Sequence, residues 1–491
     1  MKKTTGLCAL SLVSALMLVL LSCGDAEAET EAKETGAKET QNAETEAVPD
    51  ETDLRKAVSD GVPEMDFGGY TFRMYTRNRD DFVNDLSLDL EGESGDIVET
   101  ALYQRNRTVE ERFNIKLEAM YLEDPTTSAR SLITAGDDSC ALVLDNAPAT
   151  GGVISSGCYL AWDDLPYNDL SKPWYIPNVV DAMSVKKHTY MMAGEFNLSL
   201  LRFTYCMYYN KELAAQYDIN DLYERVVDHK WTYESLYTTV ADVYNDLNGD
   251  GKKDETDLYG LVTDFYGAST NYGFASGVEI MKNDKDGIPQ LVYYSEKTVD
   301  VFNKVYKLLF DNPGALSGAW GIEGTPWKEG RALFINAFFQ SASEYRDNKF
   351  DFGILPYPMY DESQESYRTH SNVAFTCCAI PTTTTDIERT SAIIEVLQAE
   401  SWKQVIPAYY ETALKVKYSR DDLASNTLDL ILAGRYLDFG IIYDQNQGCY
   451  TMMQQLFSKK SNDFSSTYEK REKAVNNHYK KIIDLIAALD D

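Results

Sequence analysis

The chain has 491 residues, and 46 Lys and Arg stand against 78 Asp and Glu, so the formal net charge is −32. Such an acidic balance excludes most nucleic-acid binders, which need a basic surface, and it disfavours electrostatic docking on anionic lipid. Apolar residues make up 44% of the sequence, which is enough for a folded core. The length is compatible with roughly three domains or with one large two-lobed α/β protein.

The first residues have the features of an export signal. Lys2 and Lys3 precede an apolar run, residues 7–21, which is too short for a membrane helix and is typical of a signal-peptide core. The run ends in Leu20-Leu21-Ser22-Cys23-Gly24, which resembles the lipobox of bacterial lipoproteins. By this resemblance, residues 1–22 are a lipoprotein signal peptide, and Cys23 carries diacylglycerol and palmitate that anchor the protein on the extracytoplasmic face of the cell membrane. The alternative is a plain secretory signal with an incidental Cys.

Acidic residues are dense directly after this Cys. Residues 24–53 carry eleven Asp and Glu and two Lys, a net charge of −9, and no aromatic residue. Such a stretch buries too little apolar surface to fold, and its like charges extend it. The sequence therefore predicts a lipid-anchored acidic linker over residues 23–65, with a helical spacer as the alternative. No later apolar run is long enough to span a bilayer.

The folded body begins with alternating strands and a helix. An alternating run at 70–75 predicts a strand, and the apolar spacing over 96–113 predicts an amphipathic helix. Further strands are predicted at 115–120 and 141–145. Strand, helix and strand at this spacing indicate βαβ units and hence an α/β fold.

Later segments add a hairpin and a terminal helix. The Asp-Gly turn within 281–288 predicts a β-hairpin. One apolar stripe near the end predicts a helix, with Val475, Tyr479, Ile482, Ile486 and Leu489 on its buried face. Six Cys follow Cys23 without a C-x-x-C pair or a Cys/His cluster, so a zinc site is not expected, and the thiols are expected to be mostly buried and free.

Four strings stand in order along the chain: YYNKEL at 208–213, WTYESL at 231–236, WKEGRALF at 327–334 and DFGILPYP at 351–358. Together they resemble the motifs of one family, the carbohydrate-type (family 1) extracellular solute-binding proteins of ABC importers. Their order and spacing match the family and cover most of residues 65–420. The local chemistry agrees for the second string, because Thr232 is a good helix N-cap and Glu234 places negative charge in the first turn. The departures are Trp327, Arg331 and the pair at 333–334, which replace the family's Phe, Lys and Ala-Met.

The resemblance implies a periplasmic-binding-protein-like class II fold, with two α/β lobes joined by a hinge around a ligand cleft. Lobe 1 would hold 66–198 plus about 372–425, and lobe 2 would hold 199–371 plus about 426–491. Such a protein binds a solute between the lobes, closes around it and delivers it to the ABC permease subunits in the membrane. It is expected to act as a monomer without nucleic-acid partners.

One loop has the spacing of a calcium site. Calcium takes six to eight oxygen ligands from positions 1, 3, 5, 7, 9 and 12 of a tight loop. Gly251, at position 6, permits the sharp turn, and position 12 is Asp rather than Glu, which resembles the dockerin form of the loop. The predicted ligands of a structural Ca²⁺ are Asp246, Asn248, Asp250, the carbonyl of Lys252, Asp254 and Asp257.

The ligand is expected to be an oligosaccharide, because aromatic residues make up 12% of the chain and sugar C–H faces pack on aromatic rings. Trp residues in loops or at element ends are the stacking candidates, first Trp174 and Trp320 and then Trp327. Polar contacts are predicted from residues that follow strands, because ligands lie at the carboxyl ends of strands in α/β sheets. These residues are Asp145, Asn146 and Glu195, with Arg346 and Asn372 as weaker candidates.

Two other functions are compatible with the sequence. A tethered glycoside hydrolase would need two carboxylates across a cleft, which 78 acidic residues can always supply. However, the chain has no G-x-S-x-G, H-E-x-x-H, Walker A or G-x-G-x-x-G string, and its four His show no nucleophile signature. A cell-surface carbohydrate-binding protein without a transporter is the other alternative. The main prediction is a solute-binding protein that is not an enzyme.

Overall fold

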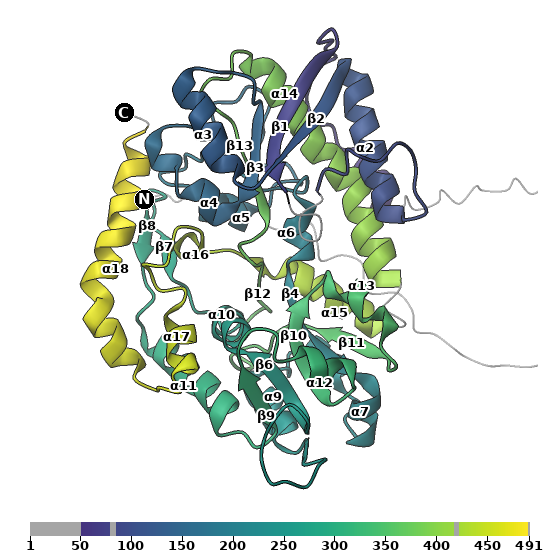
Figure 1. The fold of residues 1–491 in the computed structure, drawn as a ribbon, viewed down its shortest axis with the longest axis vertical. Coiled ribbons are helices and arrows are strands. Elements are labelled where there is room, and N and C mark those ends of the chain that lie inside the picture. Colours follow the sequence, from purple (N-terminus) through teal and green to yellow (C-terminus); the bar gives the residue numbers. More distant parts are fainter. Residues whose placement is uncertain (1–50, 79–84, 417–421, 490–491) are drawn as a thin grey trace, which may run out of the picture. The chain divides into compact units, whose positions relative to one another are not determined.

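The computed structural model describes residues 51–78, 85–416 and 422–489. These ranges belong to one compact unit, residues 50–491, and Cys23 lies outside the described residues. No helix in the described ranges combines the length and the apolar composition required to cross a bilayer. We call the four-stranded sheet with its helices lobe 1 and the six-stranded sheet with its helices lobe 2 (Figure 1).

Lobe 1 is built on a mixed sheet. Its order is β13 (Thr376–Ala379), β3 (Leu142–Asn146), β1 (Tyr70–Arg77) and β2 (Ile115–Leu122). The first three strands along the chain are parallel, and β13 pairs antiparallel with β3. Helices α2 (Ile97–Phe113), α3 (Pro125–Ala135) and α14 (Ile387–Glu400) flank the sheet (Figure 1). The predicted strands at 70–75, 115–120 and 141–145 and the predicted helix at 96–113 are confirmed.

Local sequence explains the limits of α2. Asp96 caps its start, because one carboxylate oxygen accepts hydrogen bonds from the amides of Val98 (2.8 Å) and Glu99 (3.1 Å). Asn114 ends the helix in the left-handed conformation, with φ of 50°, which Asn adopts more readily than most residues. The following strand β2 then begins at once, so cap chemistry fixes the βαβ connection at this point.

Lobe 2 is built on a second mixed sheet. Its order is β11 (Phe352–Leu355), β4 (Tyr205–Asn210), β10 (Ala332–Phe338), β6 (Leu258–Asp264) and β5 (Tyr244–Asn245), and β9 (Ala315–Gly318) pairs with the end of β6. Asn210 ends β4 and caps α7 (Lys211–Gln216) through the amides of residues 212 and 213, which explains the strand-to-helix string YYNKEL. Thr232 caps α9 (Tyr233–Ala241) as predicted.

Two of the segments that cross between the lobes lie close together. Helix α6 (Leu198–Arg202) leads from lobe 1 to β4, and residues 371–376 return to β13. Ser199 ties the two crossings together: its hydroxyl donates to Oδ2 of Asp85 (2.7 Å) and accepts from the amide of Thr376 (3.0 Å). Beside them, β12 (Thr369–His370) pairs in parallel with β14 (Arg435–Tyr436).

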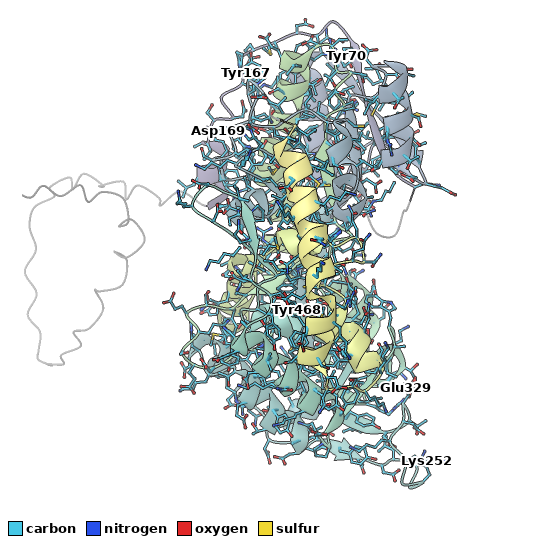
Figure 2. The ribbon with its side chains drawn as sticks, turned by 90° about the vertical axis from the view of Figure 1, so that its left-hand side faces the viewer. Tyr70, Tyr167, Asp169, Lys252, Glu329 and Tyr468 are labelled. Atoms are coloured by element: carbon cyan, nitrogen blue, oxygen red, sulfur yellow. The ribbon has the colours of Figure 1, made fainter. Side chains whose placement is uncertain are left out.

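The C-terminal segment contacts both lobes. Helix α16 (Phe439–Ile442) packs on α4 (Ala147–Gly151) and α5 (Pro177–Met183), whereas α17 (Met452–Ser458) packs on α10 (Phe265–Ala275). Helix α18 (Phe464–Ala487) contacts α11 (Glu296–Phe310) and β8 (Pro289–Leu291), and also the turn at Ile154–Ser156 that follows α4. Figure 2 shows α18 in yellow, with Tyr468 labelled. The sequence assigns residues 426–491 to lobe 2 alone, and the contacts extend this segment onto lobe 1.

The remaining local predictions agree with the structure. A hairpin forms from β7 (Met281–Asn283) and β8, and Gly287 takes the positive φ of 74° that its turn requires. On α18, Val475, Tyr479 and Ile486 are buried as predicted, whereas Ile482 is half-buried and Leu489 lies beyond the end of the helix. The six described Cys are buried and free of disulfides.

Gly448, which packs against Tyr479 of α18, supports a stability prediction. A Cβ atom added at Gly448 would overlap the hydroxyl oxygen of Tyr479 and Oδ1 of Asp444, and that hydroxyl also donates to the carbonyl of Gly440 (2.7 Å). We expect Gly448→Ala to lower the free energy of unfolding by about 1–3 kcal/mol, measured by urea denaturation. Gly273→Ala in α10 is the matched control, since nothing lies within 4 Å of the added Cβ. Equal stability of the two variants would contradict the prediction.

Candidate functional site

The carboxyl ends of the lobe 1 strands meet at one edge of the sheet. Strands β1 and β3 are parallel, so Arg77 and Asn146, their last residues, lie at the same end. Strand β13 runs the other way and begins there, with Thr376 opposite Asn146 and Cys377 opposite Asp145. Ligands of open α/β sheets bind at such an edge. We call these residues the lobe 1 edge.

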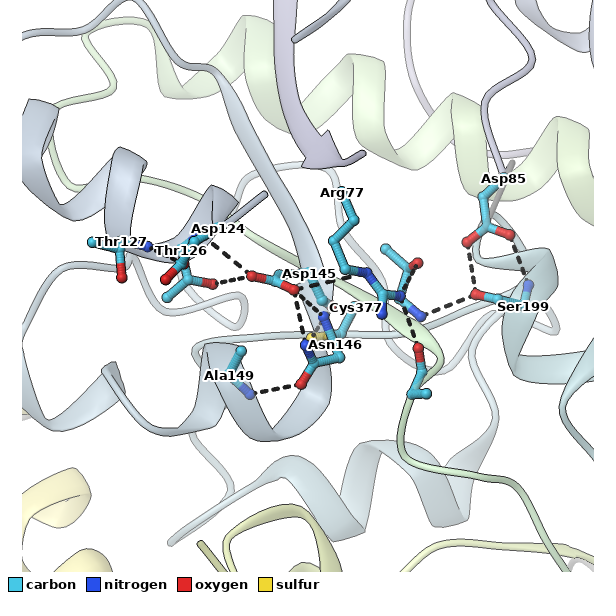
Figure 3. A network of polar contacts seen from close by, with 12 residues as sticks. Arg77, Asp85, Asp124, Thr126, Thr127, Asp145, Asn146, Ala149, Ser199 and Cys377 are labelled. Atoms are coloured by element: carbon cyan, nitrogen blue, oxygen red, sulfur yellow. Dashed lines mark hydrogen bonds and ion pairs between the residues drawn. The ribbon is translucent and has the colours of Figure 1, made fainter. Parts of the chain in front are cut away.

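Polar contacts connect the lobe 1 edge internally (Figure 3). The Nη2 atom of Arg77 donates to the carbonyl of Ala374 (2.7 Å) and to the hydroxyl of Thr376 (3.0 Å), and Nε lies 3.7 Å from Oδ1 of Asp145. Asp145 accepts from the hydroxyl of Thr126 through Oδ2 (2.8 Å). Asn146 caps α4 through the amide of residue 149. The predicted residues Asp145 and Asn146 therefore lie together at the edge, and their polar atoms hold its shape.

The lobe 2 edge is aromatic. Parallel strands β6 and β10 end at Asp264 and Phe338, and antiparallel β4 begins at Tyr205, directly opposite Phe338. The rings of Tyr205 and Phe338 have centroids 4.4 Å apart. Strand β9, parallel to β6, ends at Gly318 opposite Asp264, and the loop that follows carries Trp320. The strand register therefore gathers these side chains at one end of the sheet.

Trp320 is the most exposed large hydrophobic side chain of the lobe 2 edge. Its side chain is 63% exposed and meets the ring of Tyr266 edge to face, with centroids 6.1 Å apart. Behind it, the hydroxyls of Tyr266 and Tyr450 hydrogen bond, and the Tyr450 ring lies 6.3 Å from His370. An indole supported from one side and open on the other is a platform on which an apolar ligand face can stack. Most Trp residues are instead largely buried, so this exposure is unusual.

One short segment links the two edges. Asn372 donates through Nδ2 to the hydroxyl of Tyr205 (2.9 Å) on the lobe 2 edge. Only two residues later, the carbonyl of Ala374 accepts from Arg77 on the lobe 1 edge. Four residue steps, from Asn372 to Thr376, span at most about 14 Å. The two edges therefore lie within the length of a short oligosaccharide of each other at the crossing between the lobes.

Burial changes the pKa values of several groups at this crossing. Glu323 follows Trp320 by three residues, and desolvation, with a smaller effect from the Asp264 charge, raises its pKa to about 7. Desolvation also raises the pKa of Asp264, against the opposing effect of hydrogen bonds from the amides of Gly267 and Tyr266. His370 is fully buried, which lowers its pKa to about 3 and keeps the imidazole neutral.

The structure corrects two of the predicted stacking residues. Trp174 is fully buried, and its Nε1 donates to Oε1 of Glu395 (3.0 Å). Trp327 is 1% exposed and packs against Tyr345 and Phe350. Because both indoles are buried, neither has a free face for a ligand. Aromatic side chains beside Gly and Pro can therefore be core residues as well as ligand contacts. Of the three Trp candidates, only Trp320 lies open at an edge.

The predicted polar residues lie in different places. Glu195 is buried and its Oε1 is 3.2 Å from Nη2 of Arg435, so it forms an ion pair beside the β12–β14 ladder. Asn372 lies on the crossing between the edges, whereas Nε of the exposed Arg346 donates to the carbonyl of Ser343. Sequence reasoning missed Tyr205, Tyr266, Phe338 and Tyr450. Tyr205 and Phe338 stand at the ends of strand-like runs, which is a usable signal, but Tyr450 reaches the site only through the tertiary fold.

The predicted calcium loop is arranged by its own backbone. The Asp246 carboxylate accepts from the amides of Gly249 (2.7 Å) and Gly251 (2.9 Å), both of which have φ of 73°. Asp257 is fully buried and accepts from the amide of Leu247 and the hydroxyl of Tyr244. Within the described ranges, no three His, Cys, Asp or Glu side chains gather closely enough to hold a metal ion. The loop therefore has the donors and the tight turn for calcium, but its carboxylates do not converge.

Comparison with known proteins shows the fold. No protein-family model matches the chain, and no curated protein matches it in sequence. A cyclo/maltodextrin-binding protein complexed with maltotetraose is 13% identical, with a TM-score of 0.56, over 84% of this chain and 96% of that one. An ABC substrate-binding protein from Listeria monocytogenes, in complex with cycloalternan, is 12% identical, with a TM-score of 0.50, over 85% and 99%.

A third similar structure is the maltose-maltodextrin binding protein of Alicyclobacillus acidocaldarius, which is 11% identical, with a TM-score of 0.51, over 85% of this chain and all of that one. At such identities, structural likeness establishes the fold and leaves the ligand to be argued from the site. The predicted fold class is confirmed: the chain has the periplasmic-binding-protein-like α/β fold of these substrate-binding proteins.

Proposed function

We propose that this chain is the substrate-binding component of an ABC importer, which captures an oligosaccharide between its lobes and delivers it to a membrane permease. The observation that carries the proposal is Trp320, which is 63% exposed and supported by Tyr266 at the aromatic lobe 2 edge. Sugar rings present flat C–H faces that bury apolar area on such a platform. The lobe 1 edge, with Arg77 and Asp145, lies across the crossing and would contribute polar contacts.

Two lines support this ligand class. The three similar solved structures described above are named for binding maltodextrins or carry maltotetraose or cycloalternan. These are binding proteins. The second line is the aromatic lobe 2 edge of this chain, on which a sugar ring could stack. We propose that the chain is likewise a binder that does not convert its ligand.

Isothermal titration calorimetry with oligosaccharides tests the proposal. We expect saturable binding of at least one tri- or tetrasaccharide, without new products by chromatography. Ligand-bound protein should also unfold at higher temperature, because binding to the native state stabilises it by RT ln(1 + [L]/Kd). Binding of peptides in place of every oligosaccharide would contradict the proposed ligand class, and product formation would favour a tethered hydrolase.

We further propose that Cys23 anchors the protein to the membrane through acyl chains. Its place after an apolar run and before the acidic linker supports this role. We expect wild-type protein in the membrane fraction and Cys23→Ala in the medium or as an uncleaved precursor, scored by immunoblot. Mass spectrometry of the mature N-terminus provides the control. Release of wild-type protein with an unmodified Cys23 would contradict the anchor.

We also propose that the loop Asp246–Asp257 binds a structural calcium ion. The ligand spacing and the two glycines with positive φ support the site, and binding would draw the carboxylates inward against their mutual repulsion. Calorimetric titration with Ca²⁺ should show one binding event that Asp250→Ala removes. Asp228→Ala, at an exposed Asp outside the loop, is the matched control. No heat with the wild-type chain would contradict the proposal.

A further inference from the structure

Tyr450 reaches the Trp320 platform of the lobe 2 edge from the C-terminal segment, where it lies between α16 and α17. Its hydroxyl shares a hydrogen bond with the hydroxyl of Tyr266, 184 residues away in sequence. The Tyr266 ring meets the Tyr450 ring edge to face, with centroids 5.8 Å apart. It meets the Trp320 ring in the same way, with centroids 6.1 Å apart. Tyr266 therefore contacts both rings and links Tyr450 to Trp320.

Tyr450 is itself held by several parts of the fold. Its amide donates to Oδ1 of Asp444 (2.9 Å), and the same oxygen accepts from the hydroxyl of Tyr479 on α18 (3.3 Å). The ring of Tyr450 also meets the buried His370 ring of β12, with centroids 6.3 Å apart. On either side in sequence, α16 packs on α4 and α5 of lobe 1, and α17 packs on α10 of lobe 2 (Figure 1). The place of Tyr450 is therefore set by the packing of the C-terminal segment on both lobes.

Tyr266 needs a restraint on its side chain to support Trp320. It is the second residue of α10, and its amide donates to the capping carboxylate of Asp264 (2.8 Å), which fixes the backbone. The half-buried side chain can still rotate about two bonds unless packing or a hydrogen bond holds it. Burial raises the pKa of Tyr266, against opposing hydrogen bonds from Tyr450 and Asn372, so the hydroxyl stays protonated and can bond to Tyr450.

From these contacts we infer that Tyr450 is a positioning residue of the ligand platform. Through its hydroxyl, the C-terminal segment holds the Tyr266 ring, and this ring sets the angle at which the Trp320 indole meets a sugar. Dispersion contacts weaken steeply when a gap opens between two faces, so a small tilt of the indole would cost affinity. Tyr450 thus acts on binding without touching the ligand. The inference rests on the proposed function, because a sugar must first stack on Trp320.

Fluorine NMR tests the position of Trp320 in the full chain without any ligand. Fluorotryptophan is incorporated at every Trp, and the signal that Trp320→Phe removes is assigned to Trp320. We expect Tyr450→Phe to shift this resonance, because the ring current at the indole changes when the Tyr266 ring moves. Tyr306→Phe is the matched control. The Tyr306 hydroxyl also donates to the C-terminal segment, at the carbonyl of Lys460 (3.0 Å), and its loss should leave the Trp320 resonance in place.

Calorimetry with maltotetraose measures the consequence for binding. We expect Tyr450→Phe to raise Kd about three- to tenfold, which corresponds to the loss of one hydrogen bond. Tyr266→Phe should have the same effect, and the double variant should equal either single variant, because all three remove the same hydrogen bond. In Trp320→Ala, Tyr450→Phe should change Kd by less than about twofold, since the indole that it positions is absent. Tyr306→Phe should bind maltotetraose as wild type does.

The outcomes separate this inference from the proposed function. A Trp320 resonance that Tyr450→Phe leaves in place would overturn the inference, whatever the chain binds. Binding of no oligosaccharide, with the resonance shifted, would overturn the proposed function and retain the support of Trp320 by Tyr450. An affinity loss that persists in Trp320→Ala would show that Tyr450 touches the ligand, which also overturns the inference. Equal losses in Tyr450→Phe and Tyr306→Phe would show a general loosening of the C-terminal segment and would overturn it too.

Discussion

Replacing Trp320 by Ala is expected to weaken oligosaccharide binding by roughly 10- to 150-fold in Kd, which corresponds to about 1.5–3 kcal/mol for the apolar area that the indole covers. The side chain is 63% exposed and meets one aromatic ring, so few contacts of the folded state depend on it. The free energy of unfolding should therefore stay within about 0.5 kcal/mol of wild type. Calorimetry and urea denaturation measure the two quantities separately.

Two controls make this result specific. Trp320→Phe keeps an aromatic face and should retain most of the affinity. Tyr294→Ala removes another exposed aromatic side chain of lobe 2, which is 48% exposed and stacks on Tyr468 of α18. It should leave the sugar affinity unchanged. If Trp320→Ala bound the oligosaccharide with wild-type affinity, Trp320 would not be the stacking platform, and the proposed function would lose its main support.

The second large effect is expected at Glu395, in the core of lobe 1. Its carboxylate accepts from Nε1 of Trp174 (3.0 Å), the hydroxyl of Tyr175 (2.6 Å) and Nδ2 of Asn168 (3.0 Å). Glu395→Ala leaves these buried donors without an acceptor and creates a cavity. We expect the free energy of unfolding to fall by about 3–5 kcal/mol, measured by urea denaturation. Glu388→Ala, at an exposed site on the same helix, should change it by less than about 0.5 kcal/mol.

Glu395 also makes stability depend on pH. Desolvation raises its pKa to about 7 from the usual 4.5, against the opposing hydrogen bonds from Tyr175, Trp174 and Asn168. A raised carboxyl pKa means that the folded state takes up the proton more readily than the unfolded state. The contribution of Glu395 to the free energy of unfolding is fully present below about pH 4.5. It is lost as the pH rises through about 7, in total about 3 kcal/mol.

Glu395→Gln isolates this contribution, because an amide does not titrate. We expect the fall in unfolding free energy between pH 5 and 8 to be smaller in the variant than in wild type, by roughly the amount above. The comparison of the two proteins is the measurement, since Asp438, with a pKa raised by burial to about 6, titrates in both. Parallel pH profiles would show that Glu395 is ionised throughout and would contradict the prediction.

Local patterns predicted the elements of the fold well. The strands β1, β2 and β3 and helix α2 follow from alternation, 3.6-residue spacing and the Asp96 cap, all of which act over a few residues. Asn210 and Thr232 are similar cases, because each caps the helix that follows it. Interactions between neighbours in sequence depend little on the rest of the chain, so they can be recognised without it.

The Trp residues show where such reasoning stopped. Trp174 and Trp320 both stand among Gly or Pro in loop-like sequence, and only the first is buried. Trp174 packs against distant segments of the chain, and its indole N–H donates a hydrogen bond to Glu395, 221 residues away. Tyr450 likewise meets Tyr266 across 184 residues. Burial is decided by packing between distant segments, and a sequence window contains no record of it.

By itself, the sequence predicted an export signal, the α/β class and a series of motifs that resemble those of solute-binding proteins in their order. These features rest on local spacing and on composition. Only the tertiary structure decided which residues form the edges and that α18 contacts both lobes. Strand register and long-range packing bring such groups together, because they join segments that are hundreds of residues apart in the chain.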